Sequence, residues 1–210
     1  MKQGIQTTKL VVRRIMHGVA IALDKSTGGK ITPNGVTWFG FLMHLPIAFL
    51  IATDHLLWGA VLLIVFGLFD TLDGELARYQ KRVTNNGGFL DASTDRMKEV
   101  LLYCGAAYLL ASSAHPKHAV IAVAACGASL CVSYIKAKGE AVVASLSKKI
   151  PYTELNRMFS GGFFPFEVRM VVLIIGLFAD QLVWAVAIVA VFSTITVFQR
   201  LFVISKRLTE

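Results

Sequence analysis

The apolar residues of this chain lie in long blocks, and this arrangement limits what the chain can fold into. Of its 210 residues, 55% are hydrophobic and 16% carry a charge. A block of about 20 apolar residues can cross the hydrocarbon core of a bilayer as a helix. There each backbone polar group needs a partner within the protein, which a helix provides for itself. The sequence therefore predicts an all-α integral membrane protein.

Six blocks are long enough to be transmembrane helices. The last two form one run of 41 residues from Phe164 to Ile204. A single helix of that length would be about twice as long as the bilayer core is thick, so we expect a hairpin at Asp180 and Gln181. The six predicted spans cover residues 31–52, 56–79, 88–112, 118–141, 164–179 and 181–204.

The positive charges predict how these spans are oriented. With six spans, Lys117 is the one residue among 21 lysines and arginines that falls in a loop opposite the termini. Cytoplasmic loops are enriched in Lys and Arg, so we place both termini on the cytoplasmic side. The net charge of +8 is then explained by the enrichment of cytoplasmic loops in Lys and Arg. The sequence shows no soluble domain with a basic face, which nucleic-acid binding would require.

The N-terminal residues differ from the spans, and we divide the chain into a juxtamembrane segment, 1–30, and a membrane domain, 31–210. In residues 7–25, apolar residues at helical spacing are interleaved with basic residues. This pattern predicts an amphipathic helix lying in the membrane interface. A disordered basic tail is the alternative. We expect no signal peptide, because no short apolar core and cleavage site follow Met1.

The acidic residues are concentrated around the second and third predicted spans. Six of the 13 fall within residues 70–99. Acids beside or inside a membrane are costly to bury and therefore indicate a functional site. Asp70 and Asp73 are three residues apart, and Asp91 and Asp95 are four apart, so each pair shares one helix face.

The residues between the two pairs favour a metal site. Residues 85–88 are two asparagines and two glycines, a turn signal that would fold the third span back beside the second. The four carboxylates would then converge. Hard oxygen ligands without His or Cys suit Mg²⁺ or Mn²⁺, and paired ions promote displacement at phosphorus. We predict a metal site formed by Asp70, Asp73, Asp91 and Asp95.

Small and basic residues near the acids fit a phosphate-bearing ligand. Gly74, Ala77 and Gly87 leave room for a ligand to approach the backbone. Arg78 follows the first acidic pair by about one turn and could neutralise a phosphate. Glu75 lies off that face and is not expected to bind metal. The alternative is a set of ion pairs with nearby arginines, which would explain one or two acids but not four.

These residues form a pattern found in a known enzyme family. They read Asp70-x-x-Asp73-Gly74-x-x-Ala77-Arg78, eight residues, then Gly87-x-x-x-Asp91-x-x-x-Asp95. The chain resembles the CDP-alcohol phosphotransferases at every fixed position of their signature. The resemblance implies a CDP-diacylglycerol-type lipid donor, two metal ions per subunit, CMP as the leaving group, and a homodimer in a bacterial or archaeal cell membrane.

The resemblance also implies roles for individual residues. Asp95 would bind metal and act as general base on the acceptor hydroxyl, which attacks the β-phosphorus at the cytoplasmic side. The CDP pocket would be lined by the signature and the first span, through Gly74, Ala77, Arg78, Gly87, Asn34 and Thr37.

The end of the fourth predicted span bears on the acceptor. Residues 133–140 resemble the Ser-Tyr-x-Lys-Ala-Arg-Ala-Glu stretch of bacterial phosphatidylinositol-phosphate synthases, with Lys138 in place of Arg. Lys lacks the bidentate fork of Arg. We predict a phosphorylated alcohol, inositol phosphate first, bound by Lys136, Lys138, Arg157 and Arg169. Glycerol 3-phosphate is the alternative acceptor, and membrane anchoring is the alternative role for these basic residues.

A hypothesis of a different class is a Mg²⁺ transporter, because rings of acidic residues in membranes also select cations. It explains the carboxylates but gives no role to Gly74 or Ala77. Arg78 would repel the permeating ion. CMP release and metal flux would distinguish the two hypotheses.

Overall fold

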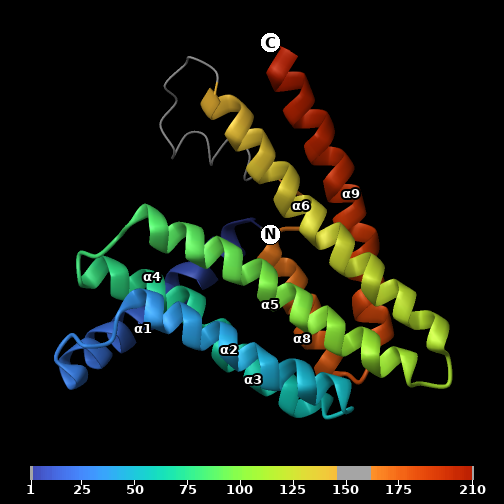
Figure 1. Ribbon diagram of the computed structural model, residues 1–210, viewed down its shortest axis with the longest axis horizontal. Helices are drawn as coiled ribbons and strands as arrows, with labels where there is room; N and C mark the ends of the chain where they lie inside the picture. The colour runs from blue at the N-terminus through green and yellow to red at the C-terminus, as the bar shows by residue number, and fades with distance from the viewer. Residues whose placement is uncertain (1, 146–161, 210) are drawn as a thin grey trace.

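Every regular element in residues 2–145 and 162–209, which the computed structural model describes, is a helix. This confirms the predicted all-α class. The elements, drawn in Figure 1, are α1 (Lys2–Thr27), α2 (Pro33–Ala52), α3 (Leu56–Gly67), α4 (Phe69–Tyr79), α5 (Asn85–Ala111), the 3₁₀ turn η1 (Pro116–His118), α6 (Ala119–Ser145), α8 (Phe166–Phe178) and α9 (Leu182–Thr209).

Threonine caps begin two of the helices that carry predicted site residues. The Thr32 hydroxyl accepts a hydrogen bond from the Gly35 N–H at 3.2 Å at the start of α2. The Thr84 hydroxyl accepts one from the Gly87 N–H at 3.0 Å at the start of α5. Such caps satisfy backbone donors that the first turn of a helix leaves without a partner. They therefore fix the first turns of α2 and α5.

Four stretches of the described chain are long and apolar enough to cross a membrane: Pro33–Ala52, Leu56–Tyr79, Pro116–Val143 and Leu182–Lys206. This confirms a multi-pass membrane protein and four of the six predicted spans. The other two predicted spans are helices that do not meet the same test. α5 has 27 residues but carries acids and bases in its first half, and α8 has only 13 residues.

The predicted second span, 56–79, is one apolar stretch made of two consecutive helices, with Leu68 between them in a helical conformation at φ −74° and ψ −16°. α3 ends at Gly67 and α4 begins at Phe69. Glycine is a poor helix former and is often found where helices kink. Leu68 thus marks the point where apolar α3 gives way to α4, which carries the first half of the signature.

The predicted hairpin between the last two spans is confirmed. α8 ends at Phe178 and α9 begins at Leu182, with Asp180 in the left-handed conformation at a φ of 53°. Asp54, between α2 and α3, has a φ of 63°. Aspartate tolerates this conformation better than most residues. In Figure 1 both turns lie at the same end of the molecule as the α5–α6 connection.

The core has a main part and a smaller one. The main part lies between α2, α3, α5, α6, α8 and α9, where Leu102 and Leu173 are fully buried. The smaller part joins α1 to α2 and α4 through Ala20, Val36, Leu72 and Leu76. Of the two helices that carry the signature, α5 therefore packs in the main part and α4 in the smaller part.

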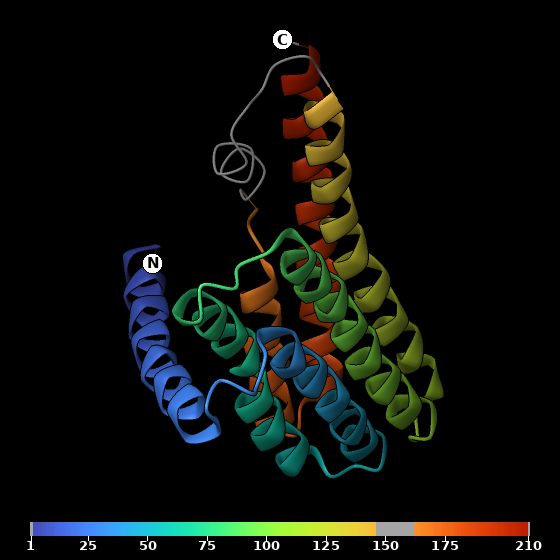
Figure 2. The ribbon, with the colours of Figure 1, turned by 60° about the vertical axis from the view of Figure 1, so that its left-hand side comes forward.

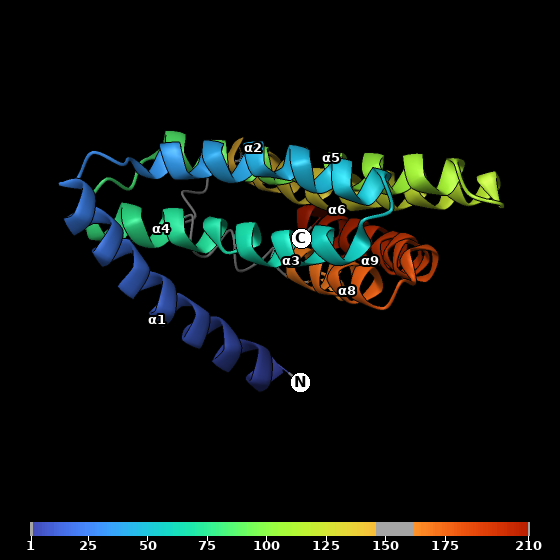
Figure 3. The same cartoon turned by 90° about the horizontal axis from the view of Figure 1, so that it is seen from below.

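α1 packs on α4 along one face and exposes apolar residues along another. Ala20 is buried, whereas Leu10, Val11 and Ile15 are each more than half exposed. Figure 3 shows α1 diverging from the other helices toward the N-terminus. The predicted helix over residues 7–25 is confirmed, and its position in a membrane interface stays a prediction.

α6 and α9 pack side by side and extend beyond the other helices, as Figure 2 shows. Arg200 of α9, which is largely buried, donates a hydrogen bond to the Val132 carbonyl of α6 at 2.7 Å. This bond ties the two helices together beside the second cavity described below.

α2 and α5 approach each other most closely at Gly105. A β-carbon added there would lie 2.5 Å from the Ala48 carbonyl oxygen, a separation that real side chains essentially never show. Glycine allows the two backbones to come this close. Gly127 in α6, by contrast, has no other atom within 4 Å of an added β-carbon.

We predict that Gly105→Ala destabilises the protein by roughly 1–3 kcal/mol, the usual cost of overpacking. Gly127→Ala is the matched control and should be neutral or slightly stabilising, because alanine is the better helix former. Thermal unfolding of the purified protein in detergent measures both changes. Equal unfolding midpoints for the two variants would contradict the close approach at Gly105.

Candidate active site

Three of the four signature aspartates converge. Carboxylate oxygens of Asp70, Asp91 and Asp95 lie within 4.8 Å of one another. Asp70 comes from the first turn of α4, and the other two come from successive turns of α5. The i, i+4 spacing places Asp91 and Asp95 on one face of α5, as the sequence predicted. We call these three residues the carboxylate cluster.

The carboxylate cluster has a cation in contact with it. The Lys98 ammonium donates to Asp70 Oδ1 and, at 3.2 Å, to Asp95 Oδ1. The Lys98 side chain is only 2% exposed. Lys98 was not predicted to be a site residue. Its position three residues after Asp95 was the one signal that could have placed it on the same face.

The carboxylate cluster fits a divalent cation. Asp91 Oδ1 is buried and has no hydrogen-bond partner within residues 2–145 and 162–209. A buried acceptor without a partner is costly, and a metal ion would satisfy it. Carboxylate oxygens without His or Cys suit Mg²⁺ or Mn²⁺. Asp70, Asp91 and Asp95 could therefore hold such an ion.

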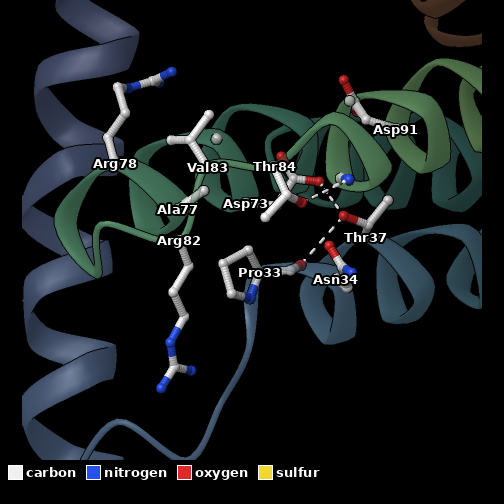
Figure 4. Close-up of a pocket in the computed structure, with 13 residues that line it drawn as sticks. Pro33, Asn34, Thr37, Asp73, Ala77, Arg78, Arg82, Val83, Thr84 and Asp91 are labelled. Carbon is white, nitrogen blue, oxygen red and sulfur yellow. Dashed lines mark hydrogen bonds between the residues drawn. The ribbon is translucent and has the colours of Figure 1, made fainter.

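Asp73 is held next to the carboxylate cluster by a hydrogen bond from α2. The Thr37 hydroxyl lies 2.6 Å from Asp73 Oδ2 and 3.2 Å from the Pro33 carbonyl oxygen, as the dashed lines of Figure 4 show. Both Thr37 and Asp73 are buried. Asp73 is not among the three carboxylates that converge. Thr37, predicted to line the CDP pocket, is thus also in a position to orient a signature aspartate.

A first cavity of about 170 Å³ opens beside Asp73 and Asp91. Its lining includes all six residues that were predicted to bind CDP: Asn34, Thr37, Gly74, Ala77, Arg78 and Gly87. Arg82 and Thr84 also line it and were not predicted. Arg82 follows Arg78 by four residues, a spacing that could have indicated a second positive charge at this cavity.

Glu75 connects Arg78 to α1. Its Oε1 accepts from Arg78 Nη2 at 2.6 Å and from Arg13 Nε at 2.9 Å, and its Oε2 lies 3.3 Å from His17 Nδ1. Glu75 is buried, so the two arginines offset the cost of its charge. In Figure 4 the Arg78 side chain extends toward α1. The sequence analysis set Glu75 aside as a metal ligand and missed this role.

A second cavity, of about 900 Å³, lies on the other side of the signature helices, between α5, α6, α8 and α9. Asp95 lines it, as do two residues predicted to bind the acceptor, Lys136 and Arg169. Lys138 is not part of this lining, and Arg157 lies outside the described residues. Arg96 and Arg200 also line the cavity and were not predicted.

Arg169 is held by a buried acid. Its Nε and Nη2 donate to the two Glu99 carboxylate oxygens at 2.9 and 3.1 Å, and its Nη1 donates to the Phe164 carbonyl at 3.3 Å. Arg169 and Glu99 are almost completely buried. This bidentate geometry fixes the guanidinium firmly. Any positive charge that Arg169 adds to the second cavity is therefore largely offset by Glu99.

Comparison with known proteins agrees with this site. Residues 30–196 match the family described as CDP-alcohol phosphatidyltransferase. The chain belongs to this enzyme family. The matched region contains every residue of the carboxylate cluster and of the first cavity.

Several members of the family are similar to this chain. A phosphatidylinositol phosphate synthase of Corynebacterium glutamicum is 38% identical over 115 residues, which cover 53% of this chain and 52% of that protein. The alignment thus spans about half the length of that relative. One from Mycobacteroides abscessus is 31% identical over 159 residues, covering 71% of each chain.

A solved structure has a similar fold. The crystal structure of Mycobacterium tuberculosis phosphatidylinositol phosphate synthase with CDP-DAG bound is 28% identical, with a TM-score of 0.76 over 91% of this chain and 94% of that one. The same protein has been solved in complex with manganese and citrate, at 27% identity, a TM-score of 0.76, and coverage of 90% of this chain and 88% of that one.

We predict that Asp91→Asn weakens Mn²⁺ binding at least about tenfold, because outer-shell changes alone often cost that much and this change alters a carboxylate of the cluster. Electron paramagnetic resonance of free Mn²⁺ measures the affinity. Asp180→Asn is the control, because it makes the same chemical change in the α8–α9 turn. Equal affinities for the two variants would remove Asp91 from the metal site.

Proposed function

We propose that this protein transfers a phosphatidyl group from a CDP-diacylglycerol-type lipid to a phosphorylated alcohol, inositol phosphate first, and releases CMP. One observation carries the proposal: signature aspartates line two separate cavities. Asp73 and Asp91 line the first cavity, and Asp95 lines the second. A donor in the first cavity and an acceptor in the second would therefore meet at the carboxylate cluster.

The first cavity suits the CDP part of the donor. Gly74 and Gly87 allow close approach of a diphosphate to the backbone, and Arg78 and Arg82 supply positive charge. The similarity to a structure that holds CDP-DAG supports this choice. The lipid tails would leave the cavity toward the surrounding membrane.

Asp70, Asp73, Asp91 and Asp95 would hold two Mg²⁺ or Mn²⁺ ions, which neutralise the charge of the diphosphate. Asp95 accepts the proton of the acceptor hydroxyl. The hydroxyl oxygen forms a bond to the β-phosphorus, the bond to the bridging oxygen breaks, and CMP leaves with that oxygen. Thr37 orients Asp73 through its 2.6 Å hydrogen bond. The positive guanidinium of Arg78 lines the first cavity and would stabilise the negative charge on the leaving phosphate.

The second cavity suits an acceptor that has both a phosphate and several hydroxyls. Three basic side chains that line it could bind the phosphate: Arg96, Lys136 and Arg200. Arg169 also lines it and stays a predicted acceptor residue, although Glu99 offsets much of its charge. Glu140 and Glu167 also line it and could accept hydrogen bonds from hydroxyls. A polyol phosphate uses both kinds of group. We retain Lys138 and Arg157 as predicted acceptor residues for the same test.

The topology belongs to the same proposal. We propose six crossings, in which α5 and α8 complete the set, and a juxtamembrane segment, 1–30, that lies in the cytoplasmic interface before the membrane domain, 31–210. The grouping of three connections at one end of the molecule supports this arrangement. The cavities would then open toward the cytoplasmic side. The homodimer stays a prediction of the family resemblance.

The acceptor is tested by CMP release from CDP-diacylglycerol, with Mg²⁺ or Mn²⁺, in the presence of inositol phosphate, glycerol 3-phosphate, serine or inositol. We expect release to be fastest with inositol phosphate. Release with glycerol 3-phosphate alone would select the alternative acceptor. No release with any acceptor, together with metal flux into liposomes, would favour a transporter.

We predict that Asp95→Asn lowers the rate of CMP release at least about 100-fold, because a general base contributes about 10²–10⁴-fold. Binding of the CDP-lipid should stay largely intact, as measured by titration of the donor. Asp54→Asn is the matched control, because it makes the same chemical change in the α2–α3 turn, away from the carboxylate cluster. Near-normal turnover of Asp95→Asn would remove Asp95 as the base.

A further inference from the structure

The α5 helix presents charges of both signs to the site. Asp91, Asp95 and Lys98 follow an i, i+4, i+7 pattern and share one helix face. The next residue, Glu99, pairs instead with Arg169 and with Arg96. Lys98 therefore contacts the carboxylate cluster, whereas Glu99 pairs with two arginines that line the second cavity.

Lys98 contacts two of the three carboxylates that could hold a metal ion. Its ammonium bonds Asp70 Oδ1 and Asp95 Oδ1, and its side chain is 2% exposed. It thus bridges α4 and α5 with a positive charge. The third member behaves differently, because Asp91 Oδ1 has no hydrogen-bond partner in the described part of the chain. Asp70 and Asp95 are thus compensated by the Lys98 ammonium, whereas Asp91 Oδ1 is not in contact with it.

An ammonium and a divalent cation that contact the same carboxylate oxygens repel each other, so binding of one disfavours binding of the other. Both are positive and both require direct contact with those oxygens. Buried charges of one sign need compensation, and three clustered carboxylates need it in the absence of metal. A lysine amine on a flexible stem can supply that charge and can also move away.

We propose that Lys98 competes with a divalent cation for Asp70 and Asp95, an inference that rests on the metal-dependent function proposed above. In the metal-free protein its ammonium holds the two carboxylates together. Metal binding at these oxygens requires the ammonium to move away. Lys98 is thus a positioning residue that lowers the affinity of the site for metal and stabilises the empty site.

Removing the charge tests this competition. In Lys98→Met, we expect Mn²⁺ affinity, measured by electron paramagnetic resonance of free Mn²⁺ with the full chain in detergent, to rise at least about fivefold. The unfolding midpoint in EDTA should fall by roughly 2–4 °C. The midpoint in saturating Mn²⁺ should fall less. A purely structural ion pair would lower stability without raising metal affinity.

Two further variants serve as controls. Lys98→Arg keeps the positive charge and should not raise Mn²⁺ affinity. Lys117→Met makes the same chemical change at an exposed residue of η1 and should alter neither quantity. An unchanged or weaker Mn²⁺ affinity in Lys98→Met would overturn the proposal.

A measurement on the unaltered protein covers the case in which Lys98→Met does not fold. Reductive methylation of Lys98, followed by mass spectrometry, should be faster in Mn²⁺ than in EDTA, because the displaced amine becomes accessible. An equal or slower rate in Mn²⁺ would refute displacement. Neither readout uses CMP release, so failure of the competition and failure of the proposed transferase function are distinguishable.

Discussion

Charge compensation inside an apolar helix bundle is the constraint on which the site depends. Removing a carboxylate from water is expensive unless a cation or hydrogen-bond donors replace the water. Glu75 is met by Arg13 and Arg78, Glu99 by Arg169, and the Asp70–Asp95 pair by Lys98. Each of these contacts joins different helices or successive turns. The basic residues that compensate the buried carboxylates therefore also hold the helices around the two cavities in position.

Local pattern was sufficient to predict most of the helices and part of the site. Apolar blocks placed α2, α6 and α9, and the residues around Asp180 marked the last hairpin correctly. The spacing of Asp91 and Asp95 placed both in the carboxylate cluster because helix geometry is regular. The six residues predicted to bind CDP, four from the family signature and two from the first span, do lie together at the first cavity.

Pairing between distant helices could not be predicted in the same way. Glu99 and Arg169 are 70 residues apart, Arg13 and Glu75 are 62 apart, and Lys98 and Asp70 are 28 apart. Such contacts depend on how each helix is rotated about its own axis, which a single sequence does not specify. The same limit explains why Asp73, which accepts a hydrogen bond from Thr37, was not recognised as lying outside the group of three converging carboxylates. The apolar pattern continues across Leu68, so the sequence predicted one span where the structure has two consecutive helices, α3 and α4.

The close approach at Gly105 affects how a lipid could reach the first cavity. With the Ala48 carbonyl only 2.5 Å from an added β-carbon, the backbones of α2 and α5 interlock and cannot slide past each other without losing that fit. The interface between α2 and α5 is therefore tightly packed at Gly105. If the proposed lipid donor enters from the membrane, separating α2 from α5 would cost this contact, so entry along another seam of the bundle is favoured.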